Sequence, residues 1–348
     1  MSSNFKLILL LCLLLPLAAC HPAKKMVTTT DSIMAFGDFV QVTLITVPRQ
    51  DQRAILKRVE DEMNYMQTAF HPWKTGPMGR TNQLLAAAGK FSANPSVIPL
   101  VRKAQRLAKE SQGLFNPAIG NLVQLWGFHA DFPPQGPPPA PGAIQKLVRQ
   151  HPRMQDISIS GIRMDNTNPA VRLDLSGIAK GYVLDFVMTR LQAEGVHDAM
   201  IDANGDLKVL GQHGNRPWHI GIRDPRGNGI IASLDARDGE GVFTSGDYEN
   251  YYDYDGKRYC NIIDPRTGYP ADKTRSVTVI NRDGALADAA ATALFVAGPK
   301  QWPGIASDMG VKLVMLIDSQ GVIYMTPQMR KRITLEKAGK EVNVVSLP

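Results

Sequence analysis

The chain has 348 residues, of which 44% are hydrophobic and 20% are charged, and its formal net charge is +7. These values exclude an intrinsically disordered protein and a collagen-like fibre, and the length indicates one large domain or two that pack closely. Three cysteines, Cys12, Cys20 and Cys260, are too few for a disulfide framework or a zinc cluster. The basic residues are spread along the chain, which favours an ordinary solvated surface over a nucleic-acid-binding patch.

The N-terminus has the features of a secretory signal. Its apolar run, residues 7–19, is shorter than the roughly 20 residues that a membrane span needs, and small residues end it. The sequence Leu17-Ala18-Ala19-Cys20 is typical of a bacterial lipobox, in which Cys20 receives the lipid. The alternative is a buried strand or helix that happens to contain a cysteine. We expect a signal peptide over 1–19 and a lipidated tether over 20–32. The mature protein would then be anchored at the periplasmic side of a bacterial membrane, the inner rather than the outer one.

The mature chain alternates strand-like and helix-like segments. Apolar residues at helical spacing predict helices over 51–68 and 96–111, the second capped by Ser96. Residues 71–82 and the proline-rich 132–142 are typical of loops. The other expected elements are a strand over 33–46, a strand over 170–175 followed by a helix over 177–194, short strands over 198–211, 217–223, 230–236 and 241–246, strands near 259–264 and 274–281, a helix over 286–297, and strands near 312–318 and 321–325.

This order of elements lacks a strict strand–helix–strand rhythm. It predicts an α+β fold of two related α/β halves packed around one site. We expect the domain to cover 33–335, followed by a C-terminal tail over 336–348.

One expected strand runs into a helix through a turn of small residues. Asp174 ends the strand, Gly177 lies in the turn, and Lys180 lies in the first turn of the helix. Exposed backbone N–H groups beside a lysine suit a phosphate. An ordinary strand–helix junction has the same pattern and is the alternative.

The alanine-rich helix near 286–297 carries a carboxylate and a hydroxyl on one face, because Asp288 and Thr292 are one helical turn apart. Oxygen ligands of this kind suit Mg²⁺ when water, a backbone carbonyl or a phosphate completes the shell. A solvated polar stripe is the alternative.

Two further regions combine turn-forming and aromatic residues. Residues 244–248 and 262–270 place polar groups beside a rigid Asp-Pro-x-Thr-Gly turn. Residues 113–117 with 125–128 could hold a planar ring or pack in a core. The sequence has no GxSxG, HExxH, P-loop or CxxC motif, and its seven histidines are scattered. A histidine metal site and a cysteine nucleophile are therefore disfavoured.

Together these segments resemble the FAD:protein FMN transferase (ApbE) family, from about Met34 to about residue 330. The matching segments, in the family's order, are 174–181, 204–206, 244–248, 262–270 and the helix with Asp288 and Thr292. The resemblance implies a T-fold-like architecture around one flavin site. It also implies a reaction in which FAD is the substrate and Mg²⁺ the cofactor. A Thr or Ser hydroxyl of an exported flavoprotein attacks the FMN phosphorus, and AMP leaves.

The resemblance also implies roles for individual residues. Asp288 and the Thr292 hydroxyl, with a backbone oxygen near Gly177, would bind the metal, and Lys180 and Asp264 are the catalytic candidates. The positions implied to contact FAD are Met34, Trp73 on the isoalloxazine, Leu114, Phe115 and Asn116 at the adenosine, Asp174, Lys180 and Ile262.

Departures from the family pattern lie near the implied site. Asn261 stands where the family commonly has His, and since Asn cannot accept a proton, Asp264 or a water is left as the base. Ala291 stands where the family often has a second Asp, which should weaken Mg²⁺ binding. The first motif, 34–38, and Asn116 also differ from the family. Two alternatives to the transferase stay open: a non-catalytic FAD-binding lipoprotein, and an FAD pyrophosphatase that releases FMN and AMP.

Overall fold

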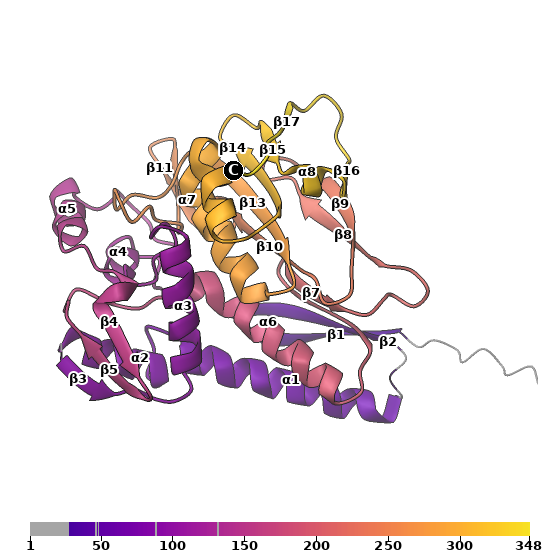
Figure 1. Ribbon diagram of the computed structural model, residues 1–348, viewed down its shortest axis with the longest axis horizontal. Helices are drawn as coiled ribbons and strands as arrows, with labels where there is room; N and C mark the ends of the chain where they lie inside the picture. Colours follow the sequence, from indigo (N-terminus) through magenta and orange to yellow (C-terminus); the bar gives the residue numbers. More distant parts are fainter. Residues whose placement is uncertain (1–27, 46, 48, 88, 131) are drawn as a thin grey trace, which may run out of the picture.

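The structure, a computed structural model, describes residues 28–45, 47, 49–87, 89–130 and 132–348. Its centre is a nine-stranded sheet, in which segments far apart in the sequence lie side by side (Figure 1). In spatial order the strands are β1 (Thr28–Ala35), β2 (Asp38–Ile45), β6 (Asp198–Ala203), β7 (Asp206–Leu210), β10 (Gly241–Gly246), β13 (Thr274–Asn281), β14 (Leu313–Asp318), β15 (Ile323–Met325) and β17 (Val342–Val344).

The sheet consists of two halves with the same order of elements. In the first half, β1 and β2 precede α6 (Ser176–Ala193), and β6 and β7 follow it. In the second half, β10 and β13 precede α7 (Gly284–Asp308), and β14 and β15 follow it. The pairs β2–β6 and β13–β14 are both antiparallel, and α6 packs against α7. The predicted α+β fold is confirmed, and the two halves are related in their topology.

A long insertion between β2 and α6 forms the lower and left parts of Figure 1. It contains α1 (Arg49–Phe70), α2 (Pro77–Ala86), β3 (Gly89–Ser92), α3 (Ile98–Glu110), α4 (Gly120–Leu125), α5 (Pro141–Arg149), the short 3₁₀ helix η1 (Met154–Asp156), β4 (Ile157–Ser160) and β5 (Arg163–Asn166). The remaining elements are β8 (Trp218–Arg223), β9 (Ile230–Ala236) and β16 (Ile333–Leu335), which form a three-stranded sheet, the hairpin β11 (Tyr251–Tyr254) and β12 (Lys257–Cys260), and α8 (Pro327–Arg330).

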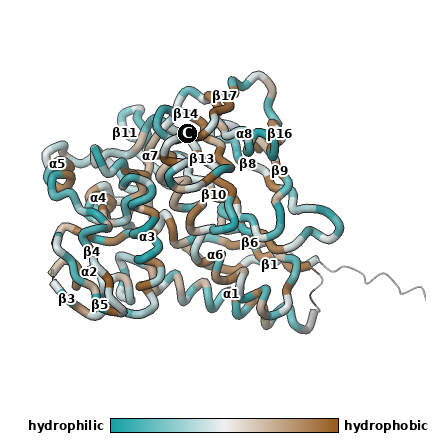
Figure 2. The backbone as a smooth tube through the Cα atoms, viewed as in Figure 1, coloured by the Kyte–Doolittle hydropathy of each residue, from teal (hydrophilic) through white to brown (hydrophobic). Residues whose placement is uncertain are grey.

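Apolar side chains cover both faces of the large sheet. One face packs against the helices, with Val42 of β2 and Val277 of β13 fully buried beside α6 and α7. The other face packs against the β16–β9–β8 sheet through residues such as Val209 and Ile323. Hydrophobic stretches run through these inner elements, and the outer loops are mostly hydrophilic (Figure 2). None of the helices in the described ranges is both long and apolar enough to cross a bilayer.

The domain extends beyond both predicted boundaries. β1 begins at Thr28, inside the segment expected to be tether, because residues 28–32 pair with β2, and Thr30 Oγ1 lies 3.0 Å from Thr43 Oγ1. At the other end, β17 pairs in parallel with β15, inside the expected tail. Exposed edge strands carry many polar residues, so a hydrophobic pattern does not reveal them. The predictions for residues 1–27, including Cys20, lie outside the described residues.

Several local predictions are wrong. The single strand predicted over 33–46 is divided by a turn at Phe36 and Gly37 into the end of β1 and the whole of β2. α2 begins at Pro77, inside the expected loop over 71–82, because proline suits the first turn of a helix. Val97 rather than Ser96 is the N-cap of α3, and the Ser96 hydroxyl has no hydrogen-bond partner among the described residues. Residues 170–175 make a single bridge to Ile119 rather than a strand.

Candidate active site

The segment that leads into α6 is fixed by hydrogen bonds on both sides. The Asn82 side chain accepts a bond from Leu173 N (2.8 Å) and donates one to Leu173 O (2.9 Å). Asp174 N donates to Pro117 O (2.8 Å), and Asp174 Oδ1 accepts from Ser176 N (3.0 Å) at the start of the helix. The backbone at the predicted phosphate-binding turn is therefore held in place by the protein itself.

Two glycines allow α6 to lie directly against α7. A Cβ atom on Gly181 would lie 2.2 Å from Gly284 O, and one on Gly177 would lie 3.0 Å from Thr292 Oγ1. Gly177 also departs from helical geometry, with φ −79° and ψ 18°. Larger side chains at these positions would push the two helices apart, so the small residues seen in the sequence set the distance between the helices.

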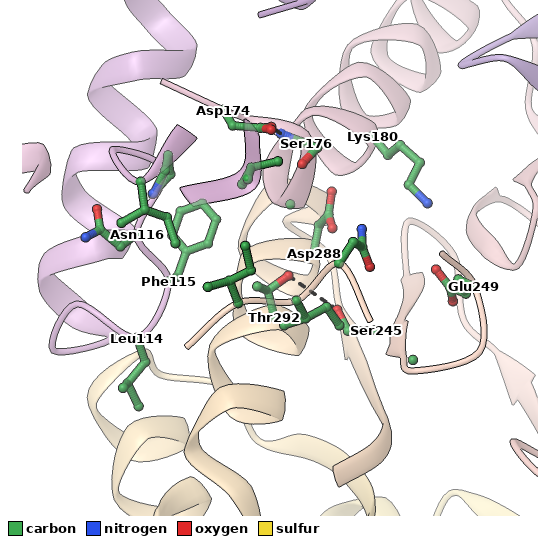
Figure 3. Close-up of a pocket in the computed structure, with 18 of the residues that line it drawn as sticks. Leu114, Phe115, Asn116, Asp174, Ser176, Lys180, Ser245, Glu249, Asp288 and Thr292 are labelled. Atoms are coloured by element: carbon green, nitrogen blue, oxygen red, sulfur yellow. Dashed lines mark hydrogen bonds between the residues drawn. The ribbon is translucent and has the colours of Figure 1, made fainter. Parts of the chain in front are cut away.

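Asp288 and Thr292 lie on α7 beside this contact (Figure 3). Gly181 N donates to Asp288 Oδ2 (3.0 Å), and Thr292 Oγ1 lies 3.3 Å from Ser245 Oγ. Asp288 is only 6% exposed. Burial, together with repulsion from Asp206, raises the pKa of Asp288 to about 7, although the N–H of Gly181 opposes the shift.

A lysine and two more carboxylates lie on the adjoining wall. Lys180 forms an ion pair with Asp206, whose Oδ1 also accepts from Thr244 N (3.0 Å). Burial lowers the pKa of Lys180, but the carboxylates around it, above all that of Asp206, raise it above its ordinary value. Glu249 keeps exposed surface, and desolvation by the surrounding protein, followed by repulsion from Asp206, raises its pKa above the ordinary value.

These side chains line one cavity, and the segment Leu114, Phe115 and Asn116 forms its opposite wall (Figure 3). The structure thus brings together most of the residues predicted to form the site. Those that line the cavity are Leu114, Phe115, Asn116, Asp174, Gly177, Lys180, Ile262, Asp288 and Thr292.

Two predicted FAD contacts lie outside the lining of this cavity. Met34 is 49% exposed and pairs with Phe39 across the β1–β2 hairpin. Trp73 lines a neighbouring cavity with Arg172, whose Cζ lies 4.2 Å from the centroid of the indole ring. The guanidinium therefore covers one side of the ring that was expected to pack on the flavin.

Asp264, predicted as a catalytic residue, does not line the cavity either. Its carboxylate accepts hydrogen bonds from Arg266 Nη2 (2.7 Å) and Nε (2.9 Å), and its backbone oxygen accepts from Gly268 N (2.8 Å). Asp264 therefore stabilises the Asp-Pro-x-Thr-Gly turn. This arrangement does not support Asp264 as the base, because its proton-accepting oxygens are engaged by a cation.

The sequence analysis did not identify Glu249 and gave no role to Asp206 and Ser245, although all three line the cavity. Asp206 and Ser245 fall in segments that the resemblance singled out, but their contacts with Lys180 and Thr292 appear only in the fold. Glu249 directly follows the 244–248 block. Its position next to that block was the one available signal.

The residues present fit a hard cation, although no three His, Cys, Asp or Glu side chains group as a metal site in the described part of the chain. Asp288 offers a buried carboxylate and Thr292 a hydroxyl one turn away, against Gly177. These are oxygen donors, which Mg²⁺ prefers, and Mg²⁺ commonly keeps several water or phosphate ligands.

The model of the ApbE family matches residues 36–315. An FAD:protein FMN transferase from Rhodobacter capsulatus is 40% identical over 321 residues, which are 92% of this chain and 61% of that protein. The chain thus spans less than two thirds of that relative. One from Klebsiella pneumoniae is 30% identical over 86% of this chain and 88% of the relative. The apo structure of the flavinyl transferase ApbE from Pseudomonas stutzeri has a TM-score of 0.77 and 28% identity, covering 88% of this chain and 97% of that one. Since sequence and fold agree over most of its length, the chain belongs to the ApbE family.

Proposed function

We propose that this protein transfers FMN from FAD to a Thr or Ser hydroxyl of an exported flavoprotein and releases AMP. The names of the relatives, FAD:protein FMN transferase, support this reaction. The observation that carries it is one cavity that combines the ammonium of Lys180 with the oxygen donors Asp288 and Thr292. A diphosphate suits this combination, because negative charge must be stabilised when its P–O bond breaks.

Mg²⁺ is the cofactor proposed for this cavity. Asp288, the Thr292 hydroxyl and a backbone oxygen beside Gly177 would hold it, and water or FAD oxygens would complete the shell. Bound there, Mg²⁺ would neutralise charge on the diphosphate. Ala291 leaves a single carboxylate on this face of the helix, so we expect the protein to depend on the phosphate oxygens for tight metal binding.

The protein's own side chains bind and orient FAD. Lys180, fixed by Asp206, would face the diphosphate, and the wall with Phe115 and Asn116 would contact the adenosine. A second cavity shares Asn116 and Ile119 with the first, which gives further room on that side. The acceptor oxygen forms a bond to the FMN phosphorus while the bond from that phosphorus to the AMP oxygen breaks.

Intact mass spectrometry tests the reaction directly. The full chain is mixed with FAD, Mg²⁺ and an exported flavoprotein domain that naturally carries FMN on a Thr, prepared in flavin-free form. The expected result is one FMN mass added to the acceptor, abolished by a chelator and absent when the acceptor Thr is replaced by Ala. Free FMN and AMP with an unmodified acceptor would instead identify an FAD pyrophosphatase. Intact, bound FAD would identify a non-catalytic flavin-binding protein.

We also propose that Cys20 carries the lipid anchor and that the protein faces the periplasm from the inner membrane. The support is the Leu17-Ala18-Ala19-Cys20 sequence at the end of a short apolar run. Cys20→Ser should move the protein from the detergent phase to the aqueous phase in a phase-separation assay. Equal partitioning of both forms would contradict the anchor.

A further inference from the structure

Glu249 lies in the candidate active site, and none of the roles above uses it. It follows β10 in the chain and lines the cavity together with Asn261. In Figure 3 its carboxylate lies on the side of the cavity opposite Asn116, near Lys180. Among the described residues, none donates a hydrogen bond to this carboxylate. Its oxygens are therefore available to a ligand in the cavity.

The proposed reaction needs a proton acceptor, because the attacking hydroxyl loses its proton as the O–P bond forms. Asn261, at the position where the family commonly has His, cannot accept it. Asp264 lies outside the cavity lining, and both of its carboxylate oxygens accept hydrogen bonds from Arg266. Neither Asn261 nor Asp264 is therefore placed to accept the proton.

The other carboxylates that line the cavity already have partners. Asp206 forms the ion pair with Lys180 and accepts a backbone hydrogen bond. Asp174 accepts a hydrogen bond from Ser176 N, the first residue of α6. Asp288 accepts a backbone N–H from the same helix and is assigned to the cation. Within the described lining, Glu249 is the carboxylate left without a partner.

We propose that Glu249 is the general base that accepts the proton of the acceptor hydroxyl. This inference rests on the proposed function. The acceptor oxygen forms its bond to the FMN phosphorus, and its proton passes to a carboxylate oxygen of Glu249. The bond between that phosphorus and AMP breaks, and its electron pair stays on the AMP phosphate.

The charges that face Glu249 support this role. Desolvation and the carboxylate of Asp206 raise the pKa of Glu249, and Asp288 acts in the same direction. Lys180 and Arg223 lower the pKa but do not cancel the increase. A pKa shifted toward the working pH leaves part of the carboxylate ionised to accept the proton and makes it a stronger base than a carboxylate in water.

The test compares Glu249→Gln with the wild type in the full chain, using the flavin-free acceptor domain described above, FAD and Mg²⁺. Gln keeps the size of the side chain but cannot accept the proton. We expect kcat to fall about 100-fold or more, while the dissociation constant for FAD and the melting temperature stay as in the wild type. Asp255→Asn, in an exposed turn of the same region, is the matched control and should keep full activity.

A second variant distinguishes a general base from a residue that only positions other groups of the site. Glu249→Gln combined with Asn261→His returns an imidazole to the cavity and should recover at least about 10-fold of the lost kcat. Failure of this rescue would make Glu249 a positioning residue and overturn the base, as would a Glu249→Gln protein with a wild-type kcat. A wild type that binds FAD but never modifies the acceptor would overturn the proposed function and the base with it.

Discussion

Asp288 is a buried carboxylate whose one hydrogen bond among the described residues comes from the backbone of Gly181. Burying such a charge is costly unless a cation compensates it. Lys180 is near enough to lower its pKa, but that ammonium is already paired with Asp206. The electrostatics of the residue thus favour a further positive charge in the cavity, in agreement with the proposed Mg²⁺.

Asp288→Asn should reduce FMN transfer at least about 100-fold, because the amide keeps the hydrogen bond from Gly181 but loses the negative charge that attracts the cation. The free energy of unfolding should stay the same or rise, since an uncompensated buried charge is removed. Initial rates in a Mg²⁺ titration measure the first effect and urea unfolding the second. An unchanged Mg²⁺ dependence would mean that the cation binds elsewhere. Asp308→Asn, at the exposed end of α7, is the control.

The sequence allowed most of the cavity to be predicted, because spacing within a helix determines which side chains share a face. The helical period placed Asp288 and Thr292 on one face, and the resemblance to the ApbE family then assigned them, with Gly177 and Lys180, to the site. The sequence did not show that Asp264 lies outside the cavity lining, because its hydrogen bonds from Arg266 depend on the conformation of the turn. Glu249 was missed because its loop is brought to the cavity by tertiary structure, which leaves no period in the sequence.

At the scale of elements, helices with a wide apolar stripe were predicted well and polar edge strands poorly. In α3, Leu100, Ala104 and Leu107 are fully buried at the spacing that predicted the helix. In β1, by contrast, residues 28–32 are mostly exposed and polar, and their pairing with β2 rests on backbone hydrogen bonds. Backbone pairing is nearly independent of the side chain, so sequence patterns do not reveal it.

The close contact between α6 and α7 allows a quantitative prediction about stability. Gly181→Ala should lower the free energy of unfolding by about 2–3 kcal/mol, because the new methyl group would lie 2.2 Å from Gly284 O. Gly304→Ala, within α7, is the matched control. The structure shows no described atom within 4 Å of the new methyl group, so this change should raise stability by about 0.5–1 kcal/mol. Urea unfolding measures both, and equal effects of the two changes would show that the helices can separate freely.

At the scale of the whole molecule, the site depends on both halves of the sheet. α6 of the first half supplies Gly177 and Lys180, and α7 of the second half supplies Asp288 and Thr292. Neither half contains the full set. Changes that loosen the packing of the halves should therefore reduce activity even when they lie far from the cavity.

A buried ion pair joins Arg332, which follows α8, to Glu240, which lies between β9 and β10. This pair should make the stability of the protein depend on pH. Arg332 donates to both carboxylate oxygens of Glu240 (2.9 and 2.8 Å). Burial opposes the charge on Glu240, but the hydrogen bonds from Arg332 and from Arg237 N outweigh it and lower the pKa below its ordinary value of 4.5.

Because the folded state lowers this pKa, the pair stabilises the protein fully above pH 4.5 and loses its effect as the pH falls through the lower, folded value. Glu240→Gln should therefore cost about 2–3 kcal/mol at neutral pH, and the difference from the wild type should shrink in acid. Urea unfolding at several pH values checks this. A difference that stays constant down to acid pH would contradict the assignment.

The C-terminal segment, expected as a tail, is part of the second half of the fold. β17 extends the sheet beside β15, Val345 N donates to Met325 O (2.9 Å), and Lys337 forms an ion pair with Asp224. Val345 and Leu347 also pack against the main core. A protein that ends at Leu335 loses these contacts together.

Removal of residues 336–348 should lower the free energy of unfolding by at least about 3 kcal/mol, because two apolar side chains and an edge strand are lost. The dissociation constant for FAD, measured in the cold where the shortened protein is still folded, should stay within about twofold of the wild type, since β13 and β14 separate β10 at the cavity from β15. Lys337→Ala is the control and should cost less than about 1 kcal/mol. If that single change reproduced the whole loss, the ion pair would account for the role of the segment, and the pairing of β17 would add nothing to stability.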